Sequence, residues 1–321
     1  KESPPAISYS SFMPPLIRSL RPRQWLKNAV VFAGLVFSGQ ALQEASLVAV
    51  ALTFVRFCMI SSAVYLFNDV LDRDRDRHHP QKKNRPIASG AVSLPLALAT
   101  SAVLAILALG AGAFYQEPGP GALGGHIPGA TAAIGLYLLL QIGYTLKLKH
   151  VVLLDVFCIA TGFLLRVLAG AWALGVLISP WLIACTVQIA LFLALCKRRA
   201  EVAASDADKI KQRPILSDYP EEVTTMLIGI MATTTLVTYT LYTLLPWQAM
   251  GSAGIMVAQG AGGKPGMVWT IPFVLYGLMR YLFLVFRRDQ GQRPELIATL
   301  DGPMIATCLG WASVIGLVLY N

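Results

Sequence analysis

Long apolar runs separated by short polar stretches make up most of this chain. Runs of about 20 apolar residues are long enough to cross the roughly 30 Å hydrocarbon core of a bilayer as α-helices. Such runs predict nine spans, at residues 24–40, 46–71, 92–115, 130–147, 152–175, 180–197, 221–245, 268–287 and 299–320. The pattern predicts an all-α integral membrane protein, in which one nine-helix domain over 24–321 follows an N-terminal segment over 1–23.

Charged residues are distributed unevenly between the predicted loops. Of the 321 residues, 55% are hydrophobic and only 13% are charged, with a formal net charge of +9. Most cations lie before the first span and in alternate loops, at 73–85, 147–149, 197–213 and 287–293, whereas the opposite loops carry only Lys264. The positive-inside rule therefore places the N-terminus in the cytoplasm and the C-terminus on the opposite side. Because this rule explains the basic balance, no nucleic-acid partner is expected.

An acidic motif ends the second predicted span, in the stretch NDVLDRDRDRHHPQKKNRP at 68–86. On a helix, Asn68, Asp69, Asp72 and Asp76 fall within an arc of about 100°, and Asp74 lies on the far side. Carboxylates this close repel one another unless a cation lies among them, and hard oxygen ligands favour Mg²⁺ over a soft metal. Since Mg²⁺ often shares its ligands with substrate phosphates, the motif predicts a magnesium site and a phosphorylated ligand.

Cations near the same cytoplasmic face are candidate phosphate ligands. Arg23 and Lys27 lie four residues apart in RPRQWLKN, on one face of a helix, although with Trp25 they also fit an interfacial belt. The other candidates are Lys82, Lys83 and Arg85 after the motif, Tyr144, Lys147 and Lys149 near the fourth loop, and Lys197, Arg198 and Glu201 after the sixth span.

Several ionisable residues lie within the predicted spans. Asp155, Arg166 and Arg280 are expected either to pair between helices or to face a wet cavity, because charge at this depth is costly. Arg56 projects to the side opposite the acidic motif, so it is expected to make a helix or subunit contact. The five cysteines lie in apolar segments without CxxC spacing, which is typical of packing residues.

The motif NDxxDxxxD at the end of the second span resembles the UbiA superfamily of intramembrane prenyltransferases. Four stretches narrow the resemblance to its phosphoribosyltransferase branch: RPRQWLKN, SSAVYLFNDVLDRDRDRHHPQKKNRPIASG, YTLKLKHVVLLDVFCIATGFLLRVLAG and LALCKRRAE. The resemblance implies a UbiA-like bundle in the bacterial plasma membrane, with an active site facing the cytoplasm. It also implies transfer of 5-phosphoribosyl from phosphoribosyl diphosphate to a decaprenyl-like polyprenyl phosphate, for synthesis of a cell-wall arabinose donor.

For this reaction we expect Asp69, Asp72 and Asp76 to be catalytic. Mg²⁺ would be held by Asn68, Asp72 and Asp76, and Asp69 would bind or orient a water or a ribose hydroxyl. The donor phosphates would be held by Lys27, Lys82, Lys83, Arg85, Tyr144, Lys147, Lys197, Arg198 and Glu201. The lipid phosphate would be held by Arg23, Lys27 and Arg198. A homo-oligomer is compatible with this interpretation.

Two other functions are compatible with parts of the pattern. Aromatic prenyltransferases of the superfamily use the same acidic motif but carry a second DxxxD after the sixth span, where this chain has Glu201, Asp206, Asp208 and DYPEE. The absence of that second motif favours a soluble sugar over a lipid as the owner of the diphosphate. An ion-coupled transporter is disfavoured, because the acids cluster at a membrane edge and no inverted repeat is visible.

Overall fold

The computed structural model describes residues 13–79, 82–113, 129–203, 215, 218–245, 248–250, 256–259, 264–288 and 301–320. Its helices up to the fourth predicted span are α1 (Pro15–Ser19), the 3₁₀-helix η2 (Pro22–Phe32), α2 (Ala33–Phe37), α3 (Glu44–Leu71), α4 (Arg73–Arg77), η3 (Lys82–Asn84), α5 (Leu94–Gly110), η4 (Ala111–Ala113) and α6 (Gly129–Leu146). The later ones are η5 (Leu148–His150), α7 (Leu154–Ala173), α8 (Pro180–Ala203), α10 (Glu221–Leu244), η7 (Met267–Thr270), α11 (Ile271–Arg288) and α13 (Gly302–Tyr320).

Each predicted span contains a helical segment, and seven segments are long and apolar enough to cross a membrane. These seven are α3, α6, α7, α8, α10, the continuous η7–α11 segment and α13. Helix α5 is apolar but shorter, and the first predicted span is divided between η2 and α2. The structure therefore confirms a helical integral membrane protein and supports seven of the nine spans by length and composition.

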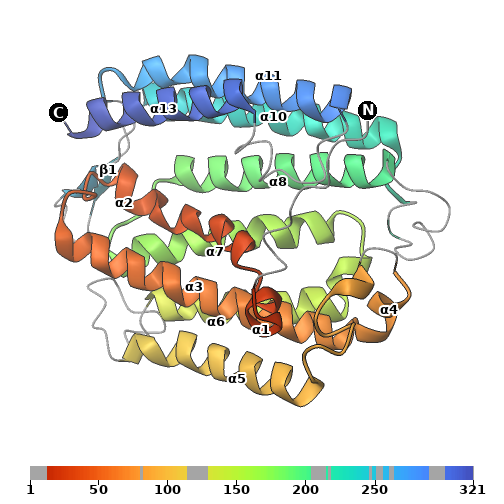
Figure 1. The fold of residues 1–321 in the computed structure, drawn as a ribbon. Helices are drawn as coiled ribbons and strands as arrows, with labels where there is room; N and C mark the ends of the chain where they lie inside the picture. The colour runs from red at the N-terminus through yellow and green to blue at the C-terminus, as the bar shows by residue number, and fades with distance from the viewer. Residues whose placement is uncertain are drawn as a thin grey trace.

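A short hairpin interrupts the helical pattern in the connection between α10 and α11. There β1 (Gln248–Met250) and β2 (Met256–Gln259) pair in antiparallel register. Figure 1 shows this hairpin at one end of the bundle and α4 at the other. Helix α13 ends on the hairpin side, so its last turn lies at the end opposite the acidic motif.

The helices pack into two halves that meet along α7 and α8 (Figure 1). Helices α10, α11 and α13 lie together on one side, while α3, α5 and α6 lie on the other. One apolar core joins α7 and α8 to α10 and α11 and includes Phe192 and Leu284. A second core joins η2, α3, α6 and α7 and includes Phe57 and Ile134. This division leaves charged residues of both halves at the α4 end of the bundle.

Arg166 ties together three helical segments inside the second half. Its guanidinium donates to Asn28 Oδ1 at 2.8 Å, to the Gly162 carbonyl at 2.7 Å and to the Tyr137 hydroxyl at 3.0 Å. It also lies over the aromatic ring of Tyr137, 4.6 Å from the ring centroid. Arg166 therefore joins η2, α6 and α7, and of the two roles expected from the sequence it has the interhelical one.

The other arginines within the predicted spans also make interhelical contacts. Arg56 donates from Nε to the Ala108 carbonyl at 2.9 Å and from Nη2 to Thr131 Oγ1 at 2.5 Å, which confirms the helix contact expected on the side away from the acidic motif. Arg280 forms an ion pair with Asp301 at 2.8 Å and so joins α11 to the start of α13. These groups stabilise packing and lie outside the acidic motif.

Gly170 allows α7 to approach η2 closely. A Cβ atom at this position would lie 1.9 Å from the Val31 carbonyl oxygen. Because a backbone atom cannot rotate away, the Gly170→Ala variant must separate η2 from α7. We expect the change to lower the free energy of unfolding by about 1–3 kcal/mol, as overpacking of a dense interior does. Thermal unfolding in detergent measures the effect.

Gly229 provides the matched control for this prediction. It lies in α10, and a Cβ atom there would meet nothing within 4 Å. Alanine is the better helix former, so Gly229→Ala should leave the unfolding temperature unchanged or raise it slightly. Equal effects of the two substitutions would contradict the close approach of η2 and α7.

Candidate functional site

The acidic motif lies where α3 bends into α4. Asp72 ends α3 and begins α4, yet its N–H still bonds to the Asn68 carbonyl at 2.9 Å and its own carbonyl accepts the Asp76 N–H at 2.8 Å. The spacing of one helical turn therefore persists through the bend. Asp69 and Asp76 are buried, at 4% and 3% exposure, whereas the Asp74 side chain is 89% exposed. The predicted separation of Asp74 from the other acids is confirmed.

Two arginines neutralise the buried acids. Arg85 Nη1 lies 3.0 Å from Asp69 Oδ1 and 2.7 Å from Asp76 Oδ2, so one guanidinium bridges both carboxylates. Arg21 Nη2 lies 2.5 Å from Asp69 Oδ1. Buried carboxylates need such partners, because removing a charge from water without one costs several kcal/mol. Arg21 is absent from the residues predicted from the sequence, since its partner lies 48 positions away.

The end of α6 and the turn after it complete the surroundings of the motif. Thr145 Oγ1 donates to Asn68 Oδ1 at 2.6 Å, and Lys149 Nζ lies 3.7 Å from Asp72 Oδ1. Tyr144 is half-buried beside Thr145, and Lys147 is exposed. The structure thus brings the α6–α7 connection to the acidic motif, and Lys149 is its residue in contact with an acid.

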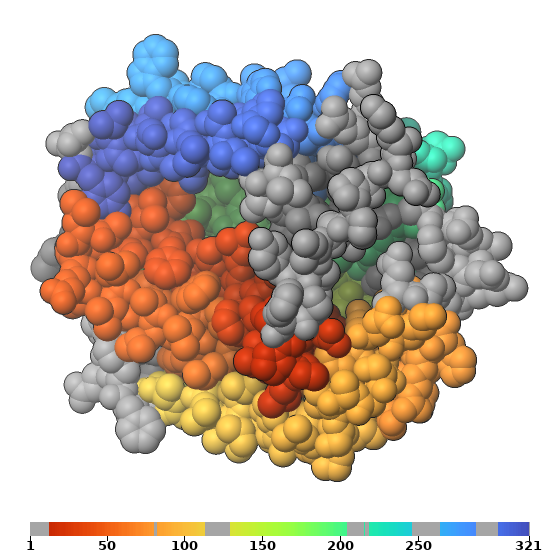
Figure 2. Space-filling view, in the orientation of Figure 1, coloured from red at the N-terminus to blue at the C-terminus, as the bar shows by residue number. Residues whose placement is uncertain are grey.

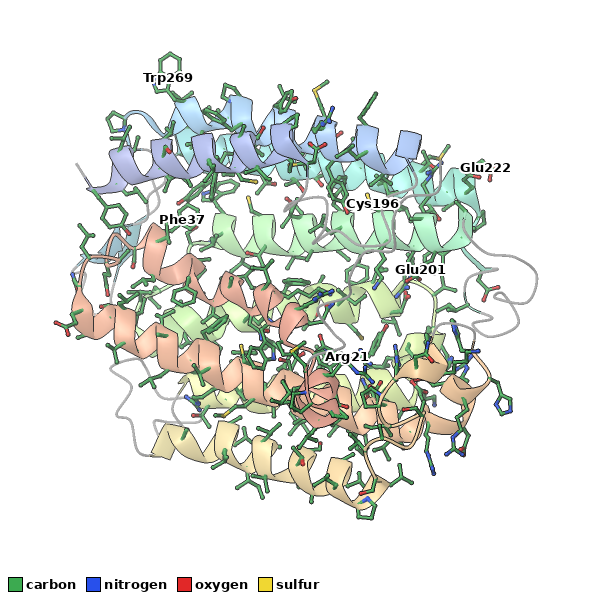
Figure 3. The ribbon with its side chains drawn as sticks, viewed as in Figure 1. Arg21, Phe37, Cys196, Glu201, Glu222 and Trp269 are labelled. Carbon is green, nitrogen blue, oxygen red and sulfur yellow. The ribbon has the colours of Figure 1, made fainter. Side chains whose placement is uncertain are left out.

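A second ionic cluster joins α7, α8 and the segment before α10. Asp155 is fully buried, and Arg198 and Tyr219 are 2% and 4% exposed. Arg198 Nε lies 2.7 Å from Asp155 Oδ2, its Nη1 bonds to Glu201, and Glu201 also lies 3.9 Å from Lys197 Nζ. These contacts direct the Arg198 guanidinium toward two carboxylates. Figure 3 shows Glu201 and Arg21 nearer the α4 end of the bundle than Phe37.

Tyr219 acts as a hydrogen-bond donor within this cluster. Its hydroxyl donates to Asp155 Oδ1 at 2.5 Å and accepts the Leu153 N–H at 2.9 Å. Burial raises the pKa of the Tyr219 phenol, and the hydrogen bond to the Asp155 carboxylate raises this pKa further. The phenol therefore stays protonated at neutral pH and keeps its donor.

The remaining predicted cations lie toward the outside of this end. Arg23, Lys82 and Lys83 are exposed, and Lys27 is half-buried. The expectation that Arg23 and Lys27 share one helical face is wrong, because η2 is a 3₁₀-helix. Such a helix has about three residues per turn, so side chains three apart align and those four apart do not. Asp206 and Asp208 lie outside the described residues.

The donor set at the motif suits magnesium chemically. Asn68, Asp72 and Asp76 offer only hard oxygen ligands, the kind that Mg²⁺ prefers. Among the described residues, no three acidic, histidine or cysteine side chains converge in a metal-binding arrangement. Arg21 and Arg85 instead supply positive charge to Asp69 and Asp76.

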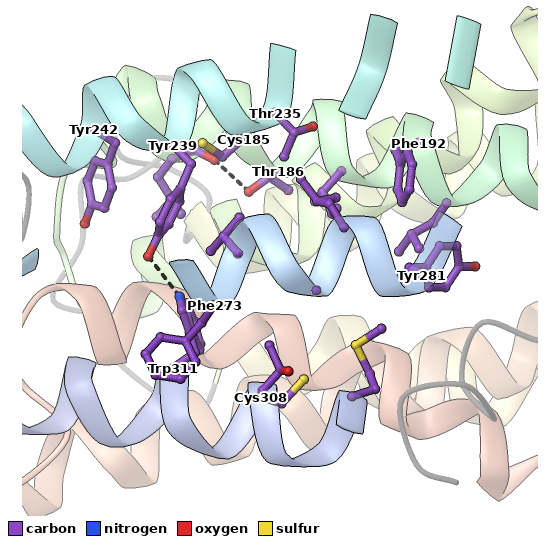
Figure 4. Close-up of a pocket in the computed structure, with 18 of the residues that line it drawn as sticks. Cys185, Thr186, Phe192, Thr235, Tyr239, Tyr242, Phe273, Tyr281, Cys308 and Trp311 are labelled. Carbon is purple, nitrogen blue, oxygen red and sulfur yellow. Dashed lines mark hydrogen bonds between the residues drawn. The ribbon is translucent and has the colours of Figure 1, made fainter. Parts of the chain in front are cut away.

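An apolar cavity of about 470 Å³ lies between α2, α8, α10, α11 and α13. Its lining includes Phe37, Phe192, Tyr239, Tyr281 and Trp311, several of which are labelled in Figure 4. The Tyr239 hydroxyl accepts the Trp311 Nε1–H at 2.8 Å. Figure 2 shows a hollow between the α2 region and α13. Residues of the α7–α8 region are visible at its bottom. Its lining is almost entirely apolar, which suits an alkyl chain better than a charged group.

The family model described as the UbiA prenyltransferase family matches residues 29–300 of this chain. The chain therefore belongs to the UbiA prenyltransferase family. A solved structure of a UbiA homologue from Archaeoglobus fulgidus, bound to GPP and Mg²⁺, superposes with a TM-score of 0.66 at 18% identity. The alignment covers 96% of this chain and 100% of that one, which shows that the two share a fold.

Two named relatives are similar over nearly the whole chain. The decaprenyl-phosphate phosphoribosyltransferase of Corynebacterium glutamicum is 31% identical over 309 residues, covering 95% of this chain and 86% of the relative. The protein of the same name from Mycolicibacterium smegmatis is 30% identical over 309 residues, covering 95% and 92%. Family and relatives together indicate an integral membrane transferase.

Binding of Mg²⁺ to the acidic motif should stabilise the folded protein, since a ligand that binds only the folded state raises the unfolding temperature. We expect Asp72→Asn and Asp76→Asn to lose most of this rise, measured by thermal unfolding in detergent with and without Mg²⁺. Asp74→Asn is the control, because this side chain points away from the motif. The same rise in all three variants would contradict the assignment of Asp72 and Asp76 as ligands.

Proposed function

We propose that this protein transfers the 5-phosphoribosyl group of phosphoribosyl diphosphate to a polyprenyl phosphate and releases diphosphate. The names of two relatives that match nearly the whole chain support this reaction. The reaction needs a polar site for a soluble diphosphate and an apolar site for a lipid. The acidic motif with its cations suits the first, and the apolar cavity suits the second.

The observation that carries this choice is the pairing of Arg198 at the end of α8. An aromatic prenyltransferase would use a second pair of carboxylates there to hold a second metal. In the described part of this chain, Glu201 is bonded to Arg198 and lies near Lys197. Arg198 also forms an ion pair with Asp155. This arrangement supports a single carboxylate motif, and hence a donor whose diphosphate is carried by a sugar.

The chemistry requires stabilisation of a leaving diphosphate. The bond from ribose C1 to the diphosphate oxygen breaks while a phosphate oxygen of the lipid bonds to C1. Mg²⁺, held by Asn68, Asp72 and Asp76, would supply positive charge to the leaving group. Arg85 and Lys149 lie at the motif, and in this proposal they would hold the diphosphate oxygens.

The acceptor does not need a strong base. A phosphate monoester is an anion at neutral pH, so positioning it near C1 supplies much of the rate. The exposed or half-buried cations Arg23, Lys27, Lys82, Lys83, Lys147 and Lys197 are candidates to steer the two phosphorylated substrates. In this proposal Arg198, Glu201 and Asp155 hold one another in position, because Arg198 forms ion pairs with both carboxylates.

The proposed setting is the bacterial plasma membrane, with the α4 end in the cytoplasm. Cationic segments at 73–85, 147–149 and 197–199 support this orientation through the positive-inside rule. The soluble donor then reaches the motif from the cytoplasm, and the product fits the synthesis of a cell-wall arabinose donor. Part of the lipid tail would lie in the apolar cavity.

Labelled phosphoribosyl diphosphate tests the reaction directly. With Mg²⁺ and a polyprenyl phosphate, the purified protein should convert the label into a lipid-extractable product and release diphosphate. Omission of the lipid, or chelation of the metal, should abolish the product. Prenylation of an aromatic acid from a polyprenyl diphosphate, with no labelled lipid in the first assay, would overturn the proposal in favour of an aromatic prenyltransferase.

The acidic motif should control turnover in this assay. We expect Asp72→Asn and Asp76→Asn to reduce kcat at least about tenfold, through lost stabilisation of the leaving group. Asp74→Asn keeps the charge change but lies on the exposed side of the motif, so its kcat should stay close to that of the unsubstituted protein. Near-normal kcat in folded Asp72→Asn and Asp76→Asn proteins would refute the metal assignment.

Filling the apolar cavity should affect the lipid alone. Gly277 lines the cavity, so Gly277→Leu places a branched side chain inside it. We expect the KM for polyprenyl phosphate to rise several-fold, while the KM for phosphoribosyl diphosphate stays unchanged. Gly229→Leu is the control, because a side chain there meets open space. An equal rise in both KM values for Gly277→Leu would contradict separate sites.

A further inference from the structure

We propose that Tyr219 is a positioning residue that holds the turn 147–153 in place, so that Lys149 of this turn faces Asp72 of the acidic motif. This inference rests on the proposed function only because one of its tests measures the proposed reaction. The turn and the phenol come from different connections, since Tyr219 precedes α10 and the turn joins α6 to α7. A contact between residues 66 positions apart in the chain therefore fixes a segment of the site.

The Tyr219 hydroxyl uses both of its hydrogen-bonding capacities on the start of α7. It accepts the Leu153 N–H at 2.9 Å and donates to Asp155 Oδ1 at 2.5 Å. A hydroxyl can both donate and accept a hydrogen bond, so the phenol serves both partners without carrying a charge. A phenylalanine in its place would leave the buried Asp155 and the Leu153 amide each without one bond.

Leu153 needs this support because its backbone is in an unfavourable conformation. Its φ is +67°, a region that a leucine side chain disfavours, and it directly precedes the first residue of α7. Such a conformation is costly and persists only when surrounding contacts fix it. The bond from its N–H to Tyr219 is one such contact, and it sets the direction in which the chain enters α7.

The strained residue is connected to Lys149 through a short turn. Inside this turn, the His150 N–H bonds to the Lys147 carbonyl at 3.1 Å, and the Val151 N–H bonds to the Leu148 carbonyl at 3.2 Å. These bonds make the turn compact, so a shift at Leu153 moves Lys149. Lys149 Nζ lies 3.7 Å from Asp72 Oδ1, a distance that a small displacement would lengthen.

The other partners of Asp155 fix the position of the carboxylate that Tyr219 contacts. Asp155 Oδ1 also accepts the Val156 N–H at 2.9 Å, and Oδ2 accepts Arg198 Nε at 2.7 Å. Arg198 is in turn bonded to Glu201, one helical turn further along α8. The carboxylate is thereby also held by contacts within α7 and from α8. This arrangement lets Tyr219 act on the turn without contacting a substrate.

A double-substitution cycle tests the inference. Tyr219→Phe and Lys149→Met should each lower kcat/KM for phosphoribosyl diphosphate by roughly fivefold, and the double variant should be no worse than Lys149→Met alone. This result is expected because Tyr219 acts through Lys149. Multiplied effects in the double variant, or an unaltered kcat/KM in Tyr219→Phe, would overturn the proposal. A purely structural role predicts multiplied effects.

Hydrogen exchange provides a readout that does not depend on the reaction. In Tyr219→Phe, amides at 147–153 should exchange faster, while those of α11 at 271–288 should be unchanged. Unaltered exchange at 147–153, or equally faster exchange in both segments, would overturn the proposal. If the unsubstituted protein transfers no phosphoribosyl group, the proposed function fails, and the exchange result still decides the role of Tyr219.

Glu221 supplies the control variant, since it lies two residues after Tyr219 and its ion pair with Arg199 also joins the start of α10 to α8. The Glu221 side chain is 62% exposed and has no part in the site. Glu221→Gln should therefore leave both kcat/KM and the exchange at 147–153 unchanged. Matching losses in Glu221→Gln and Tyr219→Phe would assign the effect to the α8–α10 connection in general and overturn the role of the phenol.

Discussion

The cost of burying charge governs the α4 end of this protein. Each buried carboxylate there has a guanidinium partner: Asp69 and Asp76 share Arg85, and Asp155 is paired with Arg198. Unpaired, any of these groups would carry a penalty of several kcal/mol, so the folded bundle has to keep these pairs in contact. The packing of the helices and the pairing of charges at this end therefore depend on each other.

The two halves of the bundle supply different environments. The half with α3 and α6 supplies the acidic motif and Thr145, whereas the half with α10, α11 and α13 lines most of the apolar cavity. Helices α7 and α8 lie between them and carry the Asp155–Arg198 pair. The polar motif and most of the apolar cavity therefore come from different halves of one bundle.

The sequence predicts the membrane helices well because the solvent on their outside is lipid, which requires continuous apolar runs. It also predicts the position of Asp74, since this depends only on local helical spacing. The pairings of Arg21 with Asp69 and of Tyr219 with Asp155 could not be predicted in this way, because these partners lie 48 and 64 residues apart. Pairing across such distances depends on how the helices pack, and a single sequence does not record it.

Helix type is a second property that the hydrophobic pattern leaves open. The 3₁₀ geometry of η2 changes which side chains align, and it also changes length. A 3₁₀-helix rises about 2.0 Å per residue against 1.5 Å for an α-helix. The stretch formed by η2 and α2 therefore extends about 30 Å, where a uniform α-helix of the same residues would reach only about 24 Å. The narrower winding of η2 therefore lengthens this stretch without adding residues.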